Sequence, residues 1–309
     1  MRAFVLPAAR STPVFAEVAA VPPADDEVTV RVEASSVNAF DLAVLDGRLR
    51  SLEHRYPVIL GRDFAGVVTA AGAGVRRFAA GDRVFGMTAR PYVGDGAFCE
   101  QLTVPAAAPD EATWMAALPD PIGMQDGGAL ATAAVAAVRA VTAMRPRPGW
   151  AALVVGASGG VGSYAVQLLA RAGARVTAVT RTERGAAHLR DLGVHDVLTE
   201  APAGRDLRYD VVLHLGGEVR RAAGCVVPGG RLVSLLHAGP ADAGRPDVDV
   251  RSVLGRPDLG VLNDLAQDVA AGRLAVPRTD TFAFADLPAA LRAVRAGTPG
   301  KVSVRMGKP

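Results

Sequence analysis

Hydrophobic positions in the first part of the chain come in short runs. Residues 26–37, DEVTVRVEASSV, alternate between apolar and polar positions, as a half-buried strand does. Further brief apolar runs, closed by Gly, Asp or Pro, occupy residues 63–72, 81–87 and 96–105. Several short strands separated by turn residues predict a small antiparallel β-barrel over residues 1 to about 119.

The pattern changes at about residue 122. An alanine-rich stretch at residues 127–144 predicts a helix, which the sequence RPRPG ends. Strand and helix patterns then alternate, and the strands are almost continuously apolar, which is typical of a parallel sheet covered on both faces. The alternating segments are 151–157, 162–173, 175–180, 183–193, 196–200, 209–217 and 230–236. Residues 237–249 are predicted to be a long loop.

The last part of the chain has helical spacing at residues 262–274 and a final short strand at residues 301–306. We therefore expect domain boundaries near residues 121 and 250, which give the segments 1–121, 122–250 and 251–309. The predicted fold class is α/β, with a β-barrel domain and a doubly wound parallel-sheet domain. A chain of 309 residues, half of them hydrophobic, is long enough for both.

Charge and cysteine content exclude several function classes. The net charge is +3, but the cations are scattered arginines, and Lys301 and Lys308 are the only lysines. No basic run is present to follow a phosphate backbone, so we expect no nucleic-acid partner. Cys99 and Cys225 belong to no CxxC pair, which argues against a disulfide framework and indicates a reducing compartment. No apolar stretch has the length of a signal peptide or a membrane span, so a cytoplasmic protein without a membrane partner is expected.

A glycine-rich turn carries the strongest chemical signal. The strand at residues 151–157 is followed by Ser158, Gly159, Gly160 and Val161, and then by a helix. The amide groups at a helix N-terminus bind a pyrophosphate when no side chain keeps it away. Gly159 permits this close approach, and Gly162 permits the helix to pack tightly on the strand. The first glycine of the usual G-x-G-x-x-G is Ala157 here, and a tight turn without a ligand is the alternative explanation.

The end of the next strand indicates which dinucleotide binds. An acid about 20 residues after the turn would accept hydrogen bonds from the ribose of NAD. Thr180 and Arg181 occupy that position, and no carboxylate follows until Glu183. Arg181 and Arg184 can instead pair with a 2′-phosphate, so the sequence favours NADPH. The alternative is that both arginines are merely exposed.

Taken together, these motifs resemble a known family. The segments SSVNAFDLAVLDG, PVILGRDFAGVV, GDRVFGM, GASGGVGSYAVQLLARAGARV and GKVSV are similar to those of the zinc-independent quinone oxidoreductases of the medium-chain dehydrogenase/reductase superfamily. The resemblance spans nearly the whole chain. It implies a GroES-like substrate and catalytic domain at 1–121, a Rossmann NADPH-binding domain at 122–250, a C-terminal segment that returns to the first domain, NADPH between the domains, and a homodimer.

The resemblance also bears on metal binding. The zinc-dependent relatives place a Cys where this chain has Asn38, and a His followed by Glu where it has Arg62 and Asp63. Arginine is not a zinc ligand, and the five histidines show no ligand spacing, so we expect no catalytic metal. Reduction of a double bond conjugated to a carbonyl needs no Lewis acid, because the carbonyl spreads the charge and hydrogen-bond donors can hold the enolate.

Candidate catalytic residues are few. The resemblance places Asn38 near the nicotinamide, where it would orient a substrate; the alternative is that it closes the turn before the next helix. Asp41 is expected to be a helix N-terminal acid. Tyrosines that often serve this family are replaced by Ala43 and Leu49, and Tyr92, in the loop RPYVGDG, is the remaining candidate.

Further cofactor contacts follow from the resemblance alone. It implies contacts with the ribose or nicotinamide at the ends of two strands and in the helix that leads into the nucleotide fold. These residues are Leu215, Gly216, Gly217, Ser234, Leu235 and Thr132. For Thr132, helix packing is the alternative explanation.

Three functions are compatible with the sequence. The first is an NADPH-dependent reductase that acts on a quinone or on the conjugated C=C of an enone or enoyl compound, with a small hydrophobic carbonyl substrate. The second is a non-redox cyclisation or isomerisation of a natural-product intermediate on the same fold, which the missing tyrosines support. The third is a protein that binds the nucleotide only, because a cofactor site does not establish catalysis.

Overall fold

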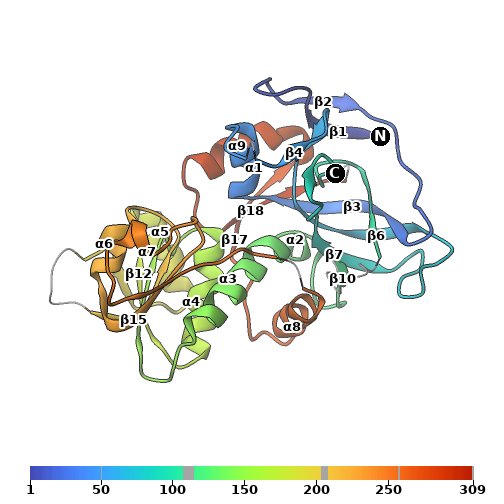
Figure 1. Cartoon of the computed structure of the whole chain (residues 1–309). Helices are drawn as coiled ribbons and strands as arrows, with labels where there is room; N and C mark the ends of the chain where they lie inside the picture. Colours follow the sequence, from blue (N-terminus) through green and yellow to red (C-terminus); the bar gives the residue numbers. More distant parts are fainter. Residues whose placement is uncertain (50, 107–114, 203–207, 257, 308–309) are drawn as a thin grey trace. The chain divides into compact units, whose positions relative to one another are not determined.

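A computed structural model describes residues 1–49, 51–106, 115–202, 208–256 and 258–307, and the contacts divide the chain into two compact units (Figure 1). Unit 1 comprises Met1–Thr132 and Pro257–Pro309, and unit 2 comprises Ala133–Arg256. The expected boundary at residue 121 lies inside unit 1, and that at residue 250 lies inside unit 2. Unit 1 is built mainly on antiparallel strands and unit 2 on a parallel sheet, so the predicted α/β fold class is confirmed.

Unit 1 holds a seven-stranded sheet in the order β10-β7-β6-β3-β18-β17, with β9 also paired to β3. Smaller sheets have the order β2-β1-β5 and β4-β8. The strands are β1 (Arg2–Leu6), β2 (Val14–Glu17), β3 (Glu27–Val37), β4 (Glu53–His54), β5 (Val58–Ile59), β6 (Asp63–Ala71), β7 (Arg83–Met87), β8 (Tyr92–Val93), β9 (Gln101–Pro105), β10 (Met115–Ala117), β17 (Arg278–Ala283) and β18 (Lys301–Arg305). The helices are α1 (Ala39–Leu45), α2 (Met124–Gly127), α8 (Leu259–Ala270), α9 (Leu287–Arg295) and the 3-10 helix η1 (Phe284–Asp286).

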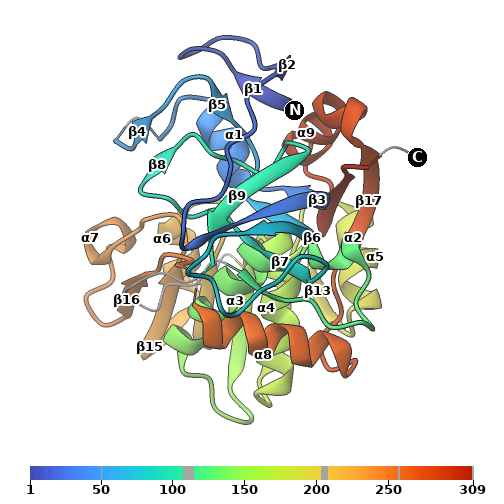
Figure 2. The same cartoon turned by 90° about the vertical axis from the view of Figure 1, so that its right-hand side faces the viewer.

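Strand β3 is more deeply buried than its alternating sequence predicts. Its first half pairs with β6 and β9 (Figure 2), and its second half pairs with β6 and β18 (Figure 1). Residues 34–37 are all buried, including Ser35 and Ser36. The register of β18 places Ser303 opposite Ser36 and Val302 opposite Val37. The last strand of the chain therefore lies directly beside the segment that precedes α1.

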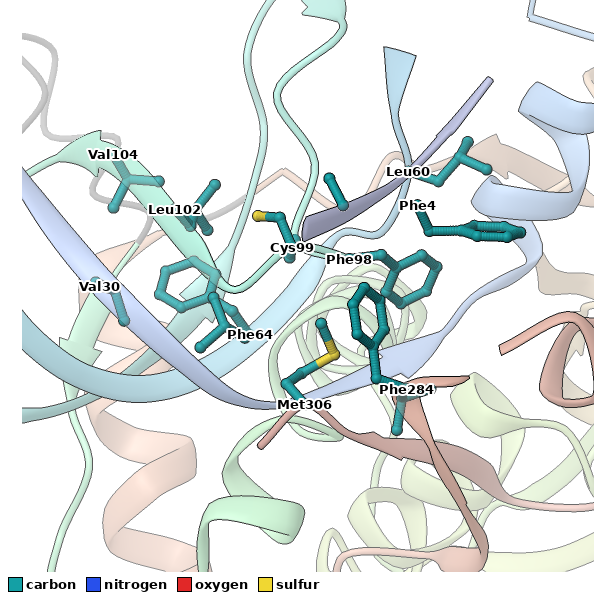
Figure 3. Packing of buried hydrophobic residues seen from close by; sticks show 14 of the residues in the cluster. Phe4, Val30, Leu60, Phe64, Phe98, Cys99, Leu102, Val104, Phe284 and Met306 are labelled. Atoms are coloured by element: carbon teal, nitrogen blue, oxygen red, sulfur yellow. The ribbon is translucent and has the colours of Figure 1, made fainter. Parts of the chain in front are cut away.

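Phenylalanine side chains form much of the core of unit 1 (Figure 3). Phe4, Phe64 and Phe98 are each at most 1% exposed, and Figure 3 shows the ring of Phe98 beside that of Phe284 from η1. Met306, which follows β18, belongs to the same cluster. Full burial of such side chains stabilises the fold by about 2–3 kcal/mol each, so this cluster holds the C-terminal segment against the N-terminal strands.

Unit 2 is a parallel sheet in the order β13-β12-β11-β14-β15-β16. Its strands are β11 (Ala151–Val155), β12 (Arg175–Val179), β13 (Asp196–Leu198), β14 (Tyr209–His214), β15 (Val226–Ser234) and β16 (Asp249–Ser252). Its helices are α4 (Gly160–Arg171), α5 (Glu183–Asp191), α6 (Val219–Gly224) and α7 (Pro240–Ala243), and α3 (Ala131–Met144) enters it from unit 1. From β11 the chain first adds β12 and β13 on one side of the sheet and then adds β14, β15 and β16 on the other side. The strand order therefore reverses between β11 and β14. Ligands of doubly wound sheets bind at such a reversal, beyond the carboxyl ends of the strands.

Two local predictions need correction. The predicted helix at residues 127–144 is interrupted, because α2 ends at Gly127 and α3 begins at Ala131. A Cβ atom on Gly128 would lie 2.8 Å from the carbonyl carbon of Ala34, so this break packs directly against β3. The predicted loop at 237–249 contains α7, because Pro240 suits a first helical turn and the Asp242 carboxylate accepts the N–H of Gly239 at 2.8 Å.

The described helices are too short or too polar for any of them to span a lipid bilayer.

Candidate functional site

The turn after β11 has the geometry expected of a phosphate-binding turn. Gly156 takes a positive φ of 84°, and Gly159 is the extended N-cap residue of α4. A Cβ atom on Gly159 would meet only the carbonyl oxygen of Gly156, at 3.7 Å, so the space in front of its backbone is open. A Cβ atom on Gly162 would lie 2.4 Å from the Ala157 oxygen, which confirms the tight helix-to-strand packing predicted there. Gly156, rather than Ala157, provides the turn conformation that the first motif glycine usually gives.

The end of β12 is joined to this turn. Thr180 is buried, and its hydroxyl donates a hydrogen bond of 2.8 Å to the hydroxyl of Ser158. Gly185, in the first turn of α5, fits against this pair because a Cβ atom there would lie 2.2 Å from the Thr180 hydroxyl. The fold therefore brings together Ser158 and Thr180, two of the predicted cofactor residues.

Cationic groups are exposed just beyond this contact. Arg181 and Arg184 are exposed, and Thr182 caps α5 by accepting the N–H of Gly185 at 3.1 Å. Glu183, the first carboxylate after the strand, accepts a hydrogen bond of 2.8 Å from Arg190. Glu183 is thus bonded to another residue of α5, and Arg181 provides positive charge at the carboxyl end of β12.

The ends of β14 and β15 are held by His214, one of the five histidines and buried at 3% exposure. Its Nε2 lies 3.1 Å from the Gly217 oxygen, which can only accept, so Nε2 carries the proton. Its Nδ1 then accepts from the Ser234 hydroxyl at 3.1 Å, and Ser234 in turn accepts the N–H of Leu236 at 3.0 Å. The sequence carries one signal of this role, which is a histidine at the end of an apolar strand.

This network fixes the predicted cofactor contacts around it. Leu215, Gly216 and Gly217 follow β14 directly, and Gly217 takes a positive φ of 74°. Ser234 ends β15, and Leu235 follows it. A Cβ atom on Gly216 would have nothing within 4 Å, so the backbone there is open.

Thr132 carries an unsatisfied polar atom. Its backbone N–H donates to the Asp63 carboxylate at 2.7 Å, but its buried hydroxyl has no hydrogen-bond partner in the part of the chain that the structure describes. Leaving such a group unpaired costs about 1–3 kcal/mol, so a ligand that pairs with it would gain affinity. The open backbone at Gly159 and Gly216, both in unit 2, separately fits the binding of a dinucleotide.

A second group of polar residues is buried in unit 1. Asp63 is fully buried, and its carboxylate accepts from the Ser36 hydroxyl at 2.6 Å, from the Asn38 amide at 2.9 Å and from the Lys301 ammonium at 3.2 Å. Lys301, which is 2% exposed, also donates to the Asn38 oxygen at 2.6 Å. Burial alone raises the pKa of Asp63, but the ammonium and the hydrogen-bond donors outweigh it and lower the pKa below its ordinary value.

Asn38 is therefore engaged on both sides of its amide. Its nitrogen donates to Asp63 and, at 3.2 Å, to the Ser36 oxygen, while its own oxygen holds Lys301. Asn38 is also the N-cap residue of α1, and Asp41 accepts its backbone N–H at 2.7 Å. Asp41 is thus the helix N-terminal acid that the sequence predicts. A role of Asn38 in orienting substrate stays a prediction.

Tyr92 lines a cavity with Asp41 and Arg62. Its hydroxyl donates to the Asp95 carboxylate, and the Arg55 guanidinium lies 3.6 Å from the centre of its ring. Burial, together with the bond to Asp95, raises the pKa of the Tyr92 phenol. The structure places Asn38 and Tyr92 in unit 1, whereas most predicted cofactor residues lie in unit 2.

The polar residues of unit 1 do not fit a zinc ion. Asn38 and Asp63, which correspond to ligand positions in zinc-dependent relatives, hold an ammonium group instead, and Arg62 offers no lone pair. Among the described residues, no group of three or more His, Cys, Asp or Glu side chains is arranged to hold a metal.

Comparisons with known proteins agree with this geometry. Residues 24–146 match the alcohol dehydrogenase GroES-like domain, and residues 184–303 match the zinc-binding dehydrogenase family. A chloroplastic quinone-oxidoreductase homolog of Spinacia oleracea is 35% identical over 212 residues, which are 64% of this chain and 62% of that protein. A mycocerosic acid synthase-like polyketide synthase of Mycobacterium tuberculosis is 35% identical over 184 residues, which are 59% of this chain and 8% of that protein. The chain thus spans less than two thirds of either relative.

Solved structures share the fold over its whole length. The quinone oxidoreductase from Coxiella burnetii has a TM-score of 0.88 at 20% identity, with 99% of both chains covered. An alcohol dehydrogenase superfamily protein from Novosphingobium aromaticivorans has a TM-score of 0.84 at 27% identity, with 99% of this chain and 100% of that chain covered. The chain, with its GroES-like and Rossmann-type parts, belongs to the quinone-oxidoreductase-like branch of the medium-chain dehydrogenase/reductase superfamily.

Proposed function

We propose that the protein is an NADPH-dependent oxidoreductase that reduces a quinone, or the conjugated C=C of an enone or enoyl compound, by hydride transfer without zinc. The observation that carries the proposal is the open backbone of Gly159 at the N-terminus of α4, next to the exposed cations after β12. The names of relatives such as the spinach quinone-oxidoreductase homolog support the reaction class.

The residues of unit 2 would bind the cofactor in distinct ways. The amide groups at the start of α4, from Gly160 onward, have no partner within the helix and would bind the diphosphate. Arg181 and Arg184 would pair with the 2′-phosphate. Once bound, the nicotinamide supplies the hydride.

The choice of NADPH over NADH can be tested by binding. We expect R181A to weaken NADPH binding by about tenfold or more and to leave NADH binding nearly unchanged, because a charged hydrogen bond contributes about 1.5–3 kcal/mol. R175A is the matched control, since Arg175 is also exposed but begins β12 rather than following it. Isothermal titration with each nucleotide gives the affinities. Equal losses for both nucleotides in R181A would contradict the assignment.

Reduction itself is tested by the oxidation of NADPH in the presence of quinones and enones, followed by the absorbance of the reduced nicotinamide. The proposal predicts substrate-dependent oxidation without added metal that a chelator leaves unchanged. Absence of oxidation across a broad panel, with NADPH bound, would overturn it.

A non-redox reaction is the second candidate, and one contact favours it. The hydroxyl of Tyr92 is engaged by Asp95, and Ala43 and Leu49 stand where relatives often have tyrosines, so none of these three positions offers a free phenol to protonate a reduced product. A cyclisation or isomerisation needs no reducing equivalent. Mass spectrometry of the product separates the two candidates, because reduction adds two hydrogens and isomerisation adds none.

The proposal includes a homodimer. Strand β16 ends the parallel sheet of unit 2, and no strand among the described residues pairs with its outer edge. A second copy could pair there across a twofold axis. Light scattering of the purified protein would measure its mass.

A further inference from the structure

A cavity of about 130 Å³ lies within unit 1 and is not explained by the cofactor site. Residues of α1, of the segment after β5 and of the loop around β8 line it, and Figure 2 shows these elements on one side of the unit. Its polar lining residues include Asp41, Arg62, Thr88, Arg90, Tyr92 and Asp95. One water-sized sphere occupies about 10–15 Å³, so a cavity of this volume has room for one end of a small molecule but not for a long chain.

Arg62 is the unusual member of this lining. Its Nε donates to the Thr88 oxygen at 3.0 Å, and its guanidinium lies 4.4 Å from the centre of the Phe40 ring. The guanidinium is buried enough that burial lowers its pKa. Among the residues that the structure describes, it nevertheless forms no salt bridge with a carboxylate, and its two terminal nitrogens have no hydrogen bond.

The other charges around the cavity are already balanced. Arg90 pairs with Glu27 at 3.0 Å and with Asp95 at 3.2 Å, and Asp95 also accepts from Tyr92. Asp41 accepts the backbone N–H groups of Asn38 and Gly61, and burial raises its pKa to about 7, so much of its negative charge is absent near neutral pH. Arg62 is therefore the cation of this lining that has no directly paired carboxylate among the described residues, while the charges of Asp41 and Asp63 act on it from a greater distance.

A planar guanidinium with unused N–H groups is suited to oxygen atoms that bear negative charge. A neutral ligand oxygen binds the guanidinium less strongly than an anionic oxygen does. This difference in binding free energy grows in a partly buried cavity, because water screens the charges less there. The stacking on Phe40 and the bond to Thr88 hold the guanidinium in place before a ligand arrives.

We propose that this cavity binds the carbonyl end of a conjugated substrate, and that the terminal nitrogens of Arg62 hold its oxygen as negative charge develops there. The inference rests on the proposed reductase function and names the substrate class as small α,β-unsaturated carbonyl compounds. A bound NADPH would supply the hydride for the new C–H bond at the β carbon and would leave as NADP⁺; the C=C π bond would break and its electron pair would move through the carbonyl to oxygen. Arg62 would hold the resulting enolate until water delivers a proton to the α carbon.

The binding of 4-nitrophenol without cofactor tests the site, because its phenolate carries charge on an oxygen conjugated to a ring and has its own visible absorbance. We expect the wild-type protein to bind the phenolate more tightly than the phenol, which lowers the apparent pKa of the bound probe. R62Q should weaken phenolate binding by about tenfold or more and abolish the pKa shift. R62K, which keeps the positive charge but lacks the planar arrangement of N–H donors, should retain part of both effects.

The matched control is R77Q, because Arg77 also stacks on a phenylalanine, Phe78 at 4.8 Å, but lies outside this cavity. R77Q should bind the phenolate as the wild type does. Wild-type binding without preference for the phenolate, or unchanged binding in both R62Q and R62K, would overturn the proposal. This readout needs neither NADPH nor turnover, so it can fail or succeed independently of the reductase activity.

Discussion

Replacement of Lys301 by Met removes the only ammonium from the buried group around Asp63. The side chains of Lys301 and Asp63 are 2% and 0% exposed and lie 3.2 Å apart. Without the ammonium, the Asp63 carboxylate keeps its bonds from Ser36 and Asn38 but stays buried as an uncompensated charge. Breaking one side of such a pair costs about 3–5 kcal/mol, so we expect K301M to lose about that much stability at pH 7.

The loss should depend on pH in a defined direction. In the wild type the pKa of Asp63 is lowered from 3.8, so this group contributes stability above that pH, and the contribution is lost as pH falls through the lower folded value. In K301M burial dominates and raises the folded pKa above 3.8, so the stability of the variant rises as pH falls from neutrality towards 4. The difference between the two proteins is therefore largest at neutral pH and narrows in acid.

Urea unfolding followed by far-UV circular dichroism, at a series of pH values, measures this difference. Hydrogen exchange of peptides from β3 and β18 assigns it to unit 1. The double variant K301M/D63N should recover part of the loss, because no charge is left buried. A difference below about 1 kcal/mol at pH 7, or one that is constant with pH, would refute the reasoning, because exposed pairs typically give no more than that.

Three further outcomes are expected. G159A should fold like the wild type but bind NADPH at least about tenfold more weakly, as titration calorimetry would measure. G162A should lose about 1–3 kcal/mol of stability in thermal unfolding. Equal stability of the two variants would contradict the geometry of this turn. Y92F should lower kcat less than about threefold, because the hydroxyl is already bonded to Asp95; a loss of a hundredfold would restore Tyr92 as a proton donor. Cys99 should resist alkylation in the native state near neutral pH, because burial raises its pKa to about 12; rapid labelling seen by mass spectrometry would show that its surroundings open.

Local patterns in the sequence predict much of this fold because they report local physics. The apolar strands of unit 2 and the glycines at 159 and 162 define the parallel sheet and its turn without any tertiary information. The break after Gly127 escaped prediction because it depends on how closely the chain approaches β3, a contact that an alanine-rich sequence does not reveal.

The buried group of unit 1 depends on contacts between distant parts of the chain. Lys301 and Asp63 are 238 positions apart, and the pairing of β18 with β3 and of β3 with β6 brings them together. The amide of Asn38 could be noted in the sequence, but its commitment to Lys301 could not. One signal was present, because lysine is so rare in this chain that its use at position 301 suggests a specific requirement.

The most direct test of the central claim follows the hydrogen atom itself. The protein is incubated with NADPH that carries deuterium at its transferable position, together with small α,β-unsaturated carbonyl compounds, and the products are analysed by mass spectrometry. Quinones are scored by the oxidation of NADPH instead, because the O–H hydrogens of a hydroquinone exchange with water. We expect a reduced product that contains one deuterium from the coenzyme and one hydrogen from water. A product that forms without deuterium, or no product at all from a protein saturated with NADPH, would contradict it.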